Sequence, residues 1–222
     1  MVRPVCVIVG AGPGVGLAVA RRFGREGMAI ALLARSDDKV QRYAADLAQD
    51  GITAQGFAAD ADDLDQLAAV LQQVARELGP PNVLIYNAVA FTPGPVSTLS
   101  ADQLLAGVRV SAAGALVAAQ QVLPAMRVQG QGTILFTGGG AAISPIPGLI
   151  SLSIGKSAIR MLAYGLAQEL EGSGIRVGTV TIFGGVAPGT DFDPDKIAER
   201  YWAFHSQPGE GGTVEISYRG AQ

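Results

Sequence analysis

The sequence predicts an α/β fold: one doubly wound sheet of about seven mostly parallel strands with helices on both faces. Short β-branched runs alternate with helical patterns along the chain, as expected for parallel strands joined by right-handed crossovers. The earlier runs are apolar without a period of two, which is typical of strands buried on both faces. The 222 residues suit a single domain, 1–222, and no repeat or interdomain linker interrupts it.

The strands are predicted from apolar, β-branched runs bounded by turn residues. We expect them at Pro4–Val9, Met28–Ala34, Thr53–Ala58, Asn82–Tyr86, Thr133–Thr137, Arg176–Ile182 and Thr213–Tyr218. The glycine-rich segment Pro208–Gly212 predicts a turn before the last of these strands.

Helical periodicity fills the intervals between the strands. We expect helices at Val15–Gly24, Asp37–Gln49, Asp62–Leu78, Ala101–Val128, Ser153–Leu170 and Pro194–Ser206. Ser36 and Ser100 are expected N-caps, and Gly51 and Gly172 are expected to end helices. Pro124 predicts a bend or an end in the fourth helix, because proline lacks the amide hydrogen that the helix needs.

Composition and charge exclude several classes of protein. A formal charge of -3 gives no electrostatic case for a nucleic-acid partner or an anionic membrane surface. No stretch approaches the roughly 20 apolar residues of a membrane span, and no signal-peptide pattern follows Met1, so we expect a cytoplasmic protein. The single cysteine, Cys6, excludes an internal disulfide, and its apolar setting predicts a buried structural thiol.

A glycine-rich turn, Gly10-Ala11-Gly12-Pro13-Gly14-Val15-Gly16, directly follows the first predicted strand. Inside a β-α-β unit this pattern predicts the dinucleotide-binding turn of a Rossmann-type domain. Gly10 permits the tight turn, Gly14 lets the backbone approach a pyrophosphate, and Gly16 lets helix and strand pack closely. The helix N-terminus then presents free amide groups to the phosphates. The expected cofactor contacts in this turn are Gly10, Gly12, Pro13, Gly14, Val15 and Gly16.

The end of the second strand predicts which nicotinamide cofactor binds. A cofactor with a free 2'-hydroxyl usually meets a carboxylate there. Here Ala34 is followed by Arg35, whose guanidinium suits a 2'-phosphate, and by Ser36, which offers a further hydrogen bond. The sequence therefore favours NADP(H) over NAD(H), with Arg35 as a solvated loop charge being the alternative interpretation.

With these landmarks the chain resembles the short-chain dehydrogenase/reductase family over nearly its whole length. Gly10-x-x-x-Gly14-x-Gly16 matches the family's phosphate loop, and Asp60 after the third strand matches its adenine-contacting aspartate. Asn87-Ala88 resembles the start of an Asn-Ala-Gly motif in which Val89 replaces the glycine, and Lys156 matches the active-site lysine. The resemblance implies cofactor contacts from Asp60, Ala61, Asn87, Ala88 and Lys156.

The chain departs from this family at its proton-handling positions. The family's tyrosine gives or takes the substrate proton, its lysine binds the nicotinamide ribose, its serine holds the substrate oxygen, and its helix asparagine anchors a relay water. On this sequence the tyrosine falls on Leu152, the serine on Gly139 and the asparagine on Ser111, so that only Lys156 is kept. One proton-transfer group is worth roughly 10²–10⁴-fold in rate, so the family's usual reaction is expected to be very slow unless the group is replaced.

Two serines beside Leu152 are the first candidates for that replacement, and Ser144, in the loop after the fifth strand, is another. Ser151 is the preferred hydroxyl and Ser153, three residues before Lys156, is its rival. A capping or solvated role is the alternative for both. The expected catalytic set is Lys156, Ser151, Ser153 and Ser111.

Three other features are candidates for the missing chemistry. Tyr86 precedes Asn87 and is either near the cofactor or a core aromatic at a strand end. His205, the only histidine, is either at a pocket or on a surface or interface. The backbone of Gly138-Gly139-Gly140 offers amide groups for a substrate oxygen without any side chain.

The substrate lid is expected to be short, because only about residues 184–193 separate the sixth strand from the next helix. The apolar helix Ile159–Leu170 resembles the family's dimer-forming helix, so we expect a homodimer or homotetramer. The leading functional hypothesis is an NADP(H)-dependent oxidoreductase of non-standard mechanism, acting on a small-molecule substrate. The alternatives are a catalytically inactive NADP(H)-binding sensor and a non-redox isomerase or cyclase that reuses the pocket.

Overall fold

The computed structural model describes residues 3–207 and 213–220, so the turn predicted at 208–212 lies outside the described residues. Seven strands form a single sheet in the order β3-β2-β1-β4-β5-β6-β7, and every pairing is parallel. The predicted strands are confirmed, with boundaries that differ by a residue or two. They are β1 (Val5–Val9), β2 (Ala29–Ala34), β3 (Ala54–Ala58), β4 (Pro81–Tyr86), β5 (Gly132–Gly139), β6 (Ile175–Ile182) and β7 (Glu215–Tyr218).

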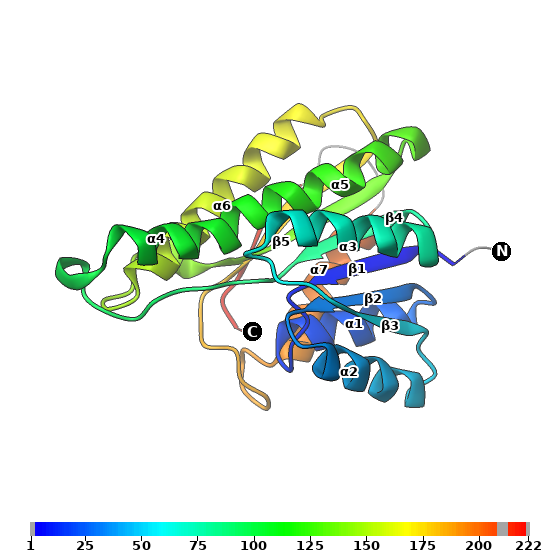
Figure 1. The fold of residues 1–222 in the computed structure, drawn as a ribbon, viewed down its shortest axis with the longest axis horizontal. Helices are drawn as coiled ribbons and strands as arrows, with labels where there is room; N and C mark the ends of the chain where they lie inside the picture. The colour runs from blue at the N-terminus through cyan, green and yellow to red at the C-terminus, as the bar shows by residue number, and fades with distance from the viewer. Residues whose placement is uncertain (1–2, 208–212, 221–222) are drawn as a thin grey trace.

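Helices cover both faces of this sheet (Figure 1). They are α1 (Val15–Arg25), α2 (Asp37–Gln49), α3 (Leu64–Glu77), α4 (Ala101–Val108), α5 (Gly114–Gln129), α6 (Ile150–Glu169) and α7 (Pro194–Ser206). One core cluster joins the sheet to α3, α5 and α6, and the other joins it to α1, α2 and α7. The predicted caps are confirmed: Ser36 accepts a bond from the Lys39 amide, and Ser100 forms a reciprocal capping box with Gln103.

The long helix predicted at Ala101–Val128 consists of three parts. A π-helical turn, η2 (Arg109–Ala113), separates α4 from α5. Of the bend or end predicted at Pro124, the end does not occur, because α5 continues to Gln129, with Val122 and Met126 buried on either side of the proline. Contrary to the expectation from the sequence, the segment Ala101–Gln129 is long and apolar enough to cross a membrane, but its α5 part packs here as a core helix on the sheet.

Helix α6 begins at Ile150, three residues before its predicted start at Ser153. No side chain caps its first turn, and the N-cap residue is Leu149, so no capping signal marks this boundary. The preceding Gly148 adopts a φ of +73°, a left-handed conformation that glycine reaches without strain. Ser151 and Ser153 therefore lie inside the first turns of the helix.

The carboxyl ends of the strands meet at one edge of the sheet. Val9 is in register with both Leu33 on β2 and Tyr86 on β4, and Tyr86 is in register with Phe136 on β5. The chain order reverses between β1 and β4, where doubly wound sheets leave a crevice. The residues that follow these strands are thereby brought together.

A partly buried carboxylate links α6 to the last strand. Glu215 accepts bonds from Arg160 (Nη2–Oε2 2.7 Å), Thr181 (Oγ1–Oε1 2.6 Å) and Tyr164 (Oη–Oε2 3.0 Å). Hydrogen bonding and the nearby guanidinium lower the pKa of Glu215 to about 2. Side chains from β6 and α6 thus bond to one carboxylate on β7.

Replacing this charge is expected to destabilise the fold. Glu215→Gln should lower the free energy of unfolding by about 1–3 kcal/mol at pH 7, because charge-assisted bonds are lost. The folded pKa is depressed, so the stabilisation is present above the unfolded pKa near 4.5 and disappears as the pH falls toward 2. Urea unfolding at several pH values measures this. Glu169→Gln, which affects an exposed pair with Arg127, is the control and should change stability by less than about 0.5 kcal/mol.

Candidate functional site

A cavity of about 720 Å³ opens at the carboxyl edge of the sheet. Its floor is the glycine-rich turn, and its walls come from the ends of β4, β5 and β6 and from α6. The lining residues are Gly12–Gly16, Asn87, Val89, Thr137–Ala141, Ser144, Ile146, Leu152, Lys156 and Ile182–Val186. Of the predicted cofactor contacts, Gly12–Gly16, Asn87 and Lys156 therefore share one cavity, whereas Gly10 and Ala88 do not line it.

The glycines of the turn divide into two kinds. A Cβ on Gly10, which has a φ of +88°, would lie 2.4 Å from the Ala88 amide nitrogen, and one on Gly16 would lie 2.9 Å from the Gly10 oxygen. Both glycines are therefore required by the fold. A Cβ on Gly12 would meet nothing within 4 Å, and one on Gly14 would meet only Val186 at 4.0 Å. The turn is thus held rigidly on one side and open toward the cavity on the other.

A chain of hydrogen bonds holds this turn to the sheet. Asn87 donates from Nδ2 to the Gly10 oxygen at 2.9 Å and accepts at Oδ1 from the Thr137 hydroxyl at 2.8 Å. The Thr137 hydroxyl also lies 2.7 Å from the hydroxyl of Tyr201 on α7, which is fully buried. Burial raises the pKa of Tyr201, so this hydroxyl stays protonated.

Lys156, on α6, lines the cavity and forms a hydrogen bond with the same threonine, Thr137. Its Nζ donates to the Thr137 carbonyl oxygen at 2.7 Å. Burial lowers the pKa of Lys156 to about 8, because a desolvated ammonium loses hydration. No carboxylate in the described part of the chain lies within ion-pair distance of it.

The two departures from the family's pattern lie beside this lysine. Leu152 is one helical turn before Lys156 and lines the cavity with it. A Cβ on Gly139 would lie 3.6 Å from Lys156 Cγ, which is an ordinary contact. The neighbouring Gly138 and Gly140 are different, since a Cβ there would lie 2.6 Å from Thr179 Oγ1 and 2.7 Å from Phe183 Cδ1. Only the middle glycine leaves room for a side chain.

The three serines of the expected catalytic set do not line the cavity, whereas Ser144 does. Ser151 is fully buried, with its hydroxyl bonded to the amide and carbonyl of Thr92 at 2.9 and 3.0 Å. Ser153 donates to the Leu149 oxygen and accepts from the Ile146 amide, both at 3.2 Å. Ser111 is buried in η2, where its Oγ would lie 2.7 Å from a Cβ on Gly155. The hydroxyls of Ser151 and Ser153 are therefore bonded to backbone groups outside the cavity lining, and the catalytic role expected for them stays a prediction.

The residues expected at the adenine end lie along the same edge but outside the cavity. Arg35, after β2, is exposed, and within the described residues no carboxylate pairs with it. Ser36 uses its oxygen to cap α2. Asp60, after β3, accepts a bond from the Asp62 amide at 3.1 Å, and the following Ala61 is buried. Their cofactor contacts stay predictions.

Tyr86 and His205 have structural positions. Tyr86 is buried in the core and donates to the Val110 oxygen. His205 lies against Thr133 at the amino end of β5, with Nδ1 2.9 Å from Oγ1, and burial lowers its pKa. Neither residue lines the cavity.

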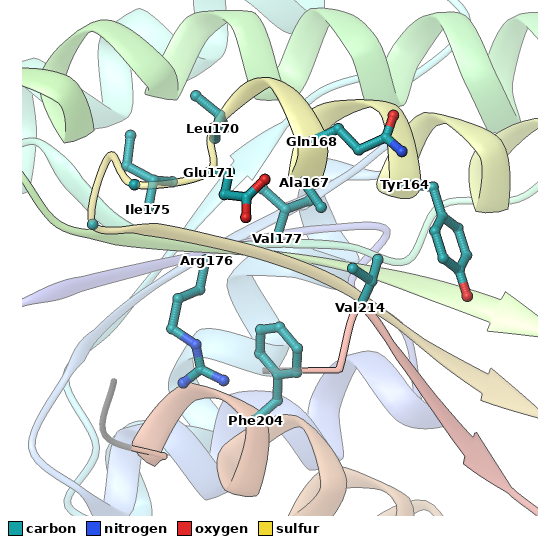
Figure 2. A pocket seen from close by; sticks show the side chains of 12 residues that line it. Tyr164, Ala167, Gln168, Leu170, Glu171, Ile175, Arg176, Val177, Phe204 and Val214 are labelled. Carbon is teal, nitrogen blue, oxygen red and sulfur yellow. The ribbon is translucent and has the colours of Figure 1, made fainter. Parts of the chain in front are cut away.

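A second cavity, of about 690 Å³, lies at the amino end of β6 (Figure 2). Its lining includes Tyr164 and Gln168 from α6, Arg176 from β6 and Phe204 from α7. The Arg176 guanidinium stacks over the Phe204 ring at 4.5 Å and donates to the Gln207 oxygen. This arginine is therefore already engaged within the protein.

Comparison with known proteins identifies the family. Residues 4–196 match the model of the short chain dehydrogenase family, to which this chain belongs. It is 32% identical over 206 residues to 2-(S)-hydroxypropyl-CoM dehydrogenase 3 of Xanthobacter autotrophicus, covering 88% of this chain and 80% of that protein. It is 29% identical to 2,3-dihydro-2,3-dihydroxybenzoate dehydrogenase of Bacillus subtilis over 80% of this chain and 68% of that one.

Solved structures agree with this assignment. A metagenomic short-chain oxidoreductase in complex with NADP superposes with a TM-score of 0.87 at 26% identity, over 99% of this chain and 97% of that one. An actinorhodin polyketide ketoreductase solved with NADPH has a TM-score of 0.90 at 23% identity, over 98% and 96% of the two chains, and supports the fold.

Thr137 and Tyr201 are the site residues that sequence reasoning missed. Thr137 lies two residues before the position compared with the family's serine, and Tyr201 follows it by more than sixty residues. Helix periodicity placed Tyr201 on one face with His205 but gave no partner for its hydroxyl. Only the packing of α7 on the sheet brings the two hydroxyls together.

Proposed function

We propose that this protein is an NADP(H)-dependent oxidoreductase that transfers hydride to or from a small organic substrate without the family's tyrosine. The single observation that carries this proposal is the shared cavity of the open glycine turn and Lys156. The relative solved in complex with NADP supports the choice of cofactor. The exposed Arg35 after β2 adds a cation suited to a 2'-phosphate.

The residues present fit such a cofactor. Gly12 and Gly14 leave open the space that side chains would fill, and the N-terminus of α1 directs free amide groups there. When bound, the nicotinamide supplies or accepts a hydride at C4. Lys156 binds the ribose hydroxyls, while Asn87 keeps the turn in place through its bond to Gly10.

The walls of the cavity favour an apolar substrate that needs little protonation. Val89, Ile146 and Val186 line it with Leu152 and Phe183. Leu152 offers no proton, so an iminium ion or an activated alkene suits reduction better than a simple ketone, or the reaction runs as an oxidation. The short segment after β6, about 184–193, is proposed as a small lid that leaves the site partly open to water.

Two other functions are kept as alternatives. A cofactor-binding sensor without catalysis is favoured by Leu152 and Gly139, which remove the usual side-chain acid and hydrogen-bond donor. A non-redox isomerase or cyclase would use the cavity without hydride transfer. Cofactor binding argues against the isomerase or cyclase, and cofactor oxidation argues against the sensor.

A binding and single-turnover experiment tests the proposal. NADPH should quench protein fluorescence and bind at least tenfold more tightly than NADH, and NADPH absorbance should fall when imines, enones and carbonyls are added in turn. Gly12→Val should weaken NADPH binding at least tenfold (about 1.4 kcal/mol) while the protein stays folded, because its side chain enters only the cavity. Gly165→Ala, with equally free space on α6, is the matched control. Wild-type protein that binds no NADPH would exclude this function.

Restoring the missing groups provides a second prediction. Gly139→Ser combined with Leu152→Tyr should give or raise ketone reduction by roughly 10²-fold or more, because a proton donor and a hydrogen-bond donor return to the cavity. Gly139 has an extended φ of -163° and ordinary clearance, so serine should fit. Gly140→Ser is the control and should disturb the fold through Phe183. A double variant that binds NADPH but reduces no ketone would show that these two positions are not the limiting ones.

We also propose a cytoplasmic homodimer or homotetramer. Leu105 on α4 and Met161 on α6 are each 62% exposed, on two helices that contact each other. Burying this face would remove apolar area from water. Light scattering should show two or four copies, and Met161→Glu should reduce that number. A monomeric wild type at micromolar concentration would contradict the assembly, and cell fractionation tests the location.

A further inference from the structure

Lys156 is the only ionisable side chain among the described residues that line the catalytic cavity. The other polar side chains there are Asn87, Thr137 and Ser144. Asn87 and Thr137 are already bonded to Gly10, to each other and to Tyr201. A serine hydroxyl and an amide do not release protons near neutral pH without a base beside them. Any side-chain proton transfer in this cavity therefore falls to the lysine.

The surroundings of the lysine suit that task. Its one hydrogen bond within the described residues goes to the Thr137 carbonyl, so two of the three N–H groups of the ammonium are left for a ligand. No negative charge within the described chain holds the proton in place. The pKa lowered to about 8 means that both the ammonium and the amine are populated near neutral pH.

Gly139 and Leu152, the two neighbours of Lys156 in the cavity wall, leave its side chain uncovered on the cavity side. The empty Cβ position of Gly139 lies 3.6–3.7 Å from the Cγ, Cδ and Cε atoms of Lys156, so no side chain covers that flank. Leu152, one turn earlier on α6, contributes only hydrocarbon to the same wall. Apolar neighbours of this kind destabilise the charged form of an amine and favour proton release.

We propose that Lys156 is itself the proton-transfer residue of this cavity, and not only a ligand of the cofactor. The inference rests on the proposed NADP(H)-dependent function. In reduction, hydride adds to the carbon of a C=N or C=O bond and the π electron pair moves to the heteroatom. One N–H bond of Lys156 breaks as its proton joins that heteroatom, and the neutral amine then takes a proton from water. In oxidation the neutral amine accepts the proton instead.

A titration without cofactor or substrate tests the first requirement. The chain has three lysines, and Lys39 and Lys196 are exposed references. In protein labelled with ¹³C-lysine, the Cε shift of Lys156 should follow a midpoint about two pH units below the ~10.4 of an ordinary exposed lysine. Lys39→Arg and Lys196→Arg assign the signals while leaving Lys156 untouched. An ordinary midpoint for Lys156 overturns the inference, whether or not NADPH binds.

The kinetic arm uses the neutral imine or carbonyl substrate of the panel that wild type reduces fastest, because its reduction requires a proton at the heteroatom. kcat/KM for reduction should fall tenfold per pH unit above about 8, and for oxidation it should fall below that pH. Lys156→Arg keeps a cation and its N–H groups but releases no proton, so NADPH binding should stay within about threefold while kcat falls at least 100-fold.

Three outcomes separate this inference from the proposed function. An arginine variant with kcat within tenfold of wild type, or a flat pH profile, overturns the lysine's role while leaving the oxidoreductase intact. Absence of NADPH binding or of any turnover in wild type overturns the proposed function, and the inference with it. If the arginine variant does not fold, the wild-type pH profile and the lysine titration still decide.

Discussion

The cavity depends on the way Thr137 is held at the end of β5. Its hydroxyl bonds to Asn87 and Tyr201, and its carbonyl accepts the ammonium of Lys156. Asn87 passes the constraint on to the Gly10 carbonyl, 77 residues away in the chain. One residue thereby fixes the positions of the glycine turn, α6 and α7. Because these side chains bond to one another and to the backbone, little side-chain ordering remains to be done on ligand binding.

Such a network also explains how a polar arrangement persists in an apolar setting. Tyr201 and the surrounding strand ends are buried, and an unpaired hydroxyl or amide there would cost about 1–3 kcal/mol. Each side chain of the hydrogen-bond network, which consists of Asn87, Thr137 and Tyr201, instead has a partner. Lys156 differs from these side chains because it carries a charge. Its ammonium donates to a carbonyl oxygen, and no carboxylate in the described part of the chain pairs with it. The low-dielectric neighbourhood that strengthens these bonds also weakens the hold of the lysine on its proton.

Much of the fold was predictable because the signals for it are local. The alternation of apolar runs, the caps at Ser36 and Ser100 and the turn at Gly10 each depend on a few neighbouring residues. The π-helical turn and the start of α6 at Ile150 were not predictable, since packing against the sheet and a left-handed glycine decide them.

The candidate site was predictable to the extent that its residues belong to one motif. The glycine turn, Asn87 and Lys156 were expected together and lie together. Ser151 and Ser153 were expected to help, but sequence distance does not show which side of a helix reaches a cavity. A rotation of about 100° per residue turns both away from the wall that Leu152 and Lys156 share. The partner of Tyr201 required the tertiary fold.

Gly139 and Leu152, which stand where the family has a serine and a tyrosine, affect the chemistry of the cavity and not the folding of the chain. Gly138 and Gly140 are glycines because a Cβ would strike Thr179 or Phe183 at less than 3 Å, whereas Gly139 has ordinary clearance. Leu152 occupies a wall that opens on the cavity, where a longer side chain would extend into free space. The scaffold therefore places no steric demand for the residues now present at these two positions. What they alter is the polarity around Lys156, because a tyrosine and a serine at these positions would bring hydroxyl groups to the cavity and a leucine and a glycine do not. The lysine consequently carries alone whatever acid–base chemistry the cavity performs.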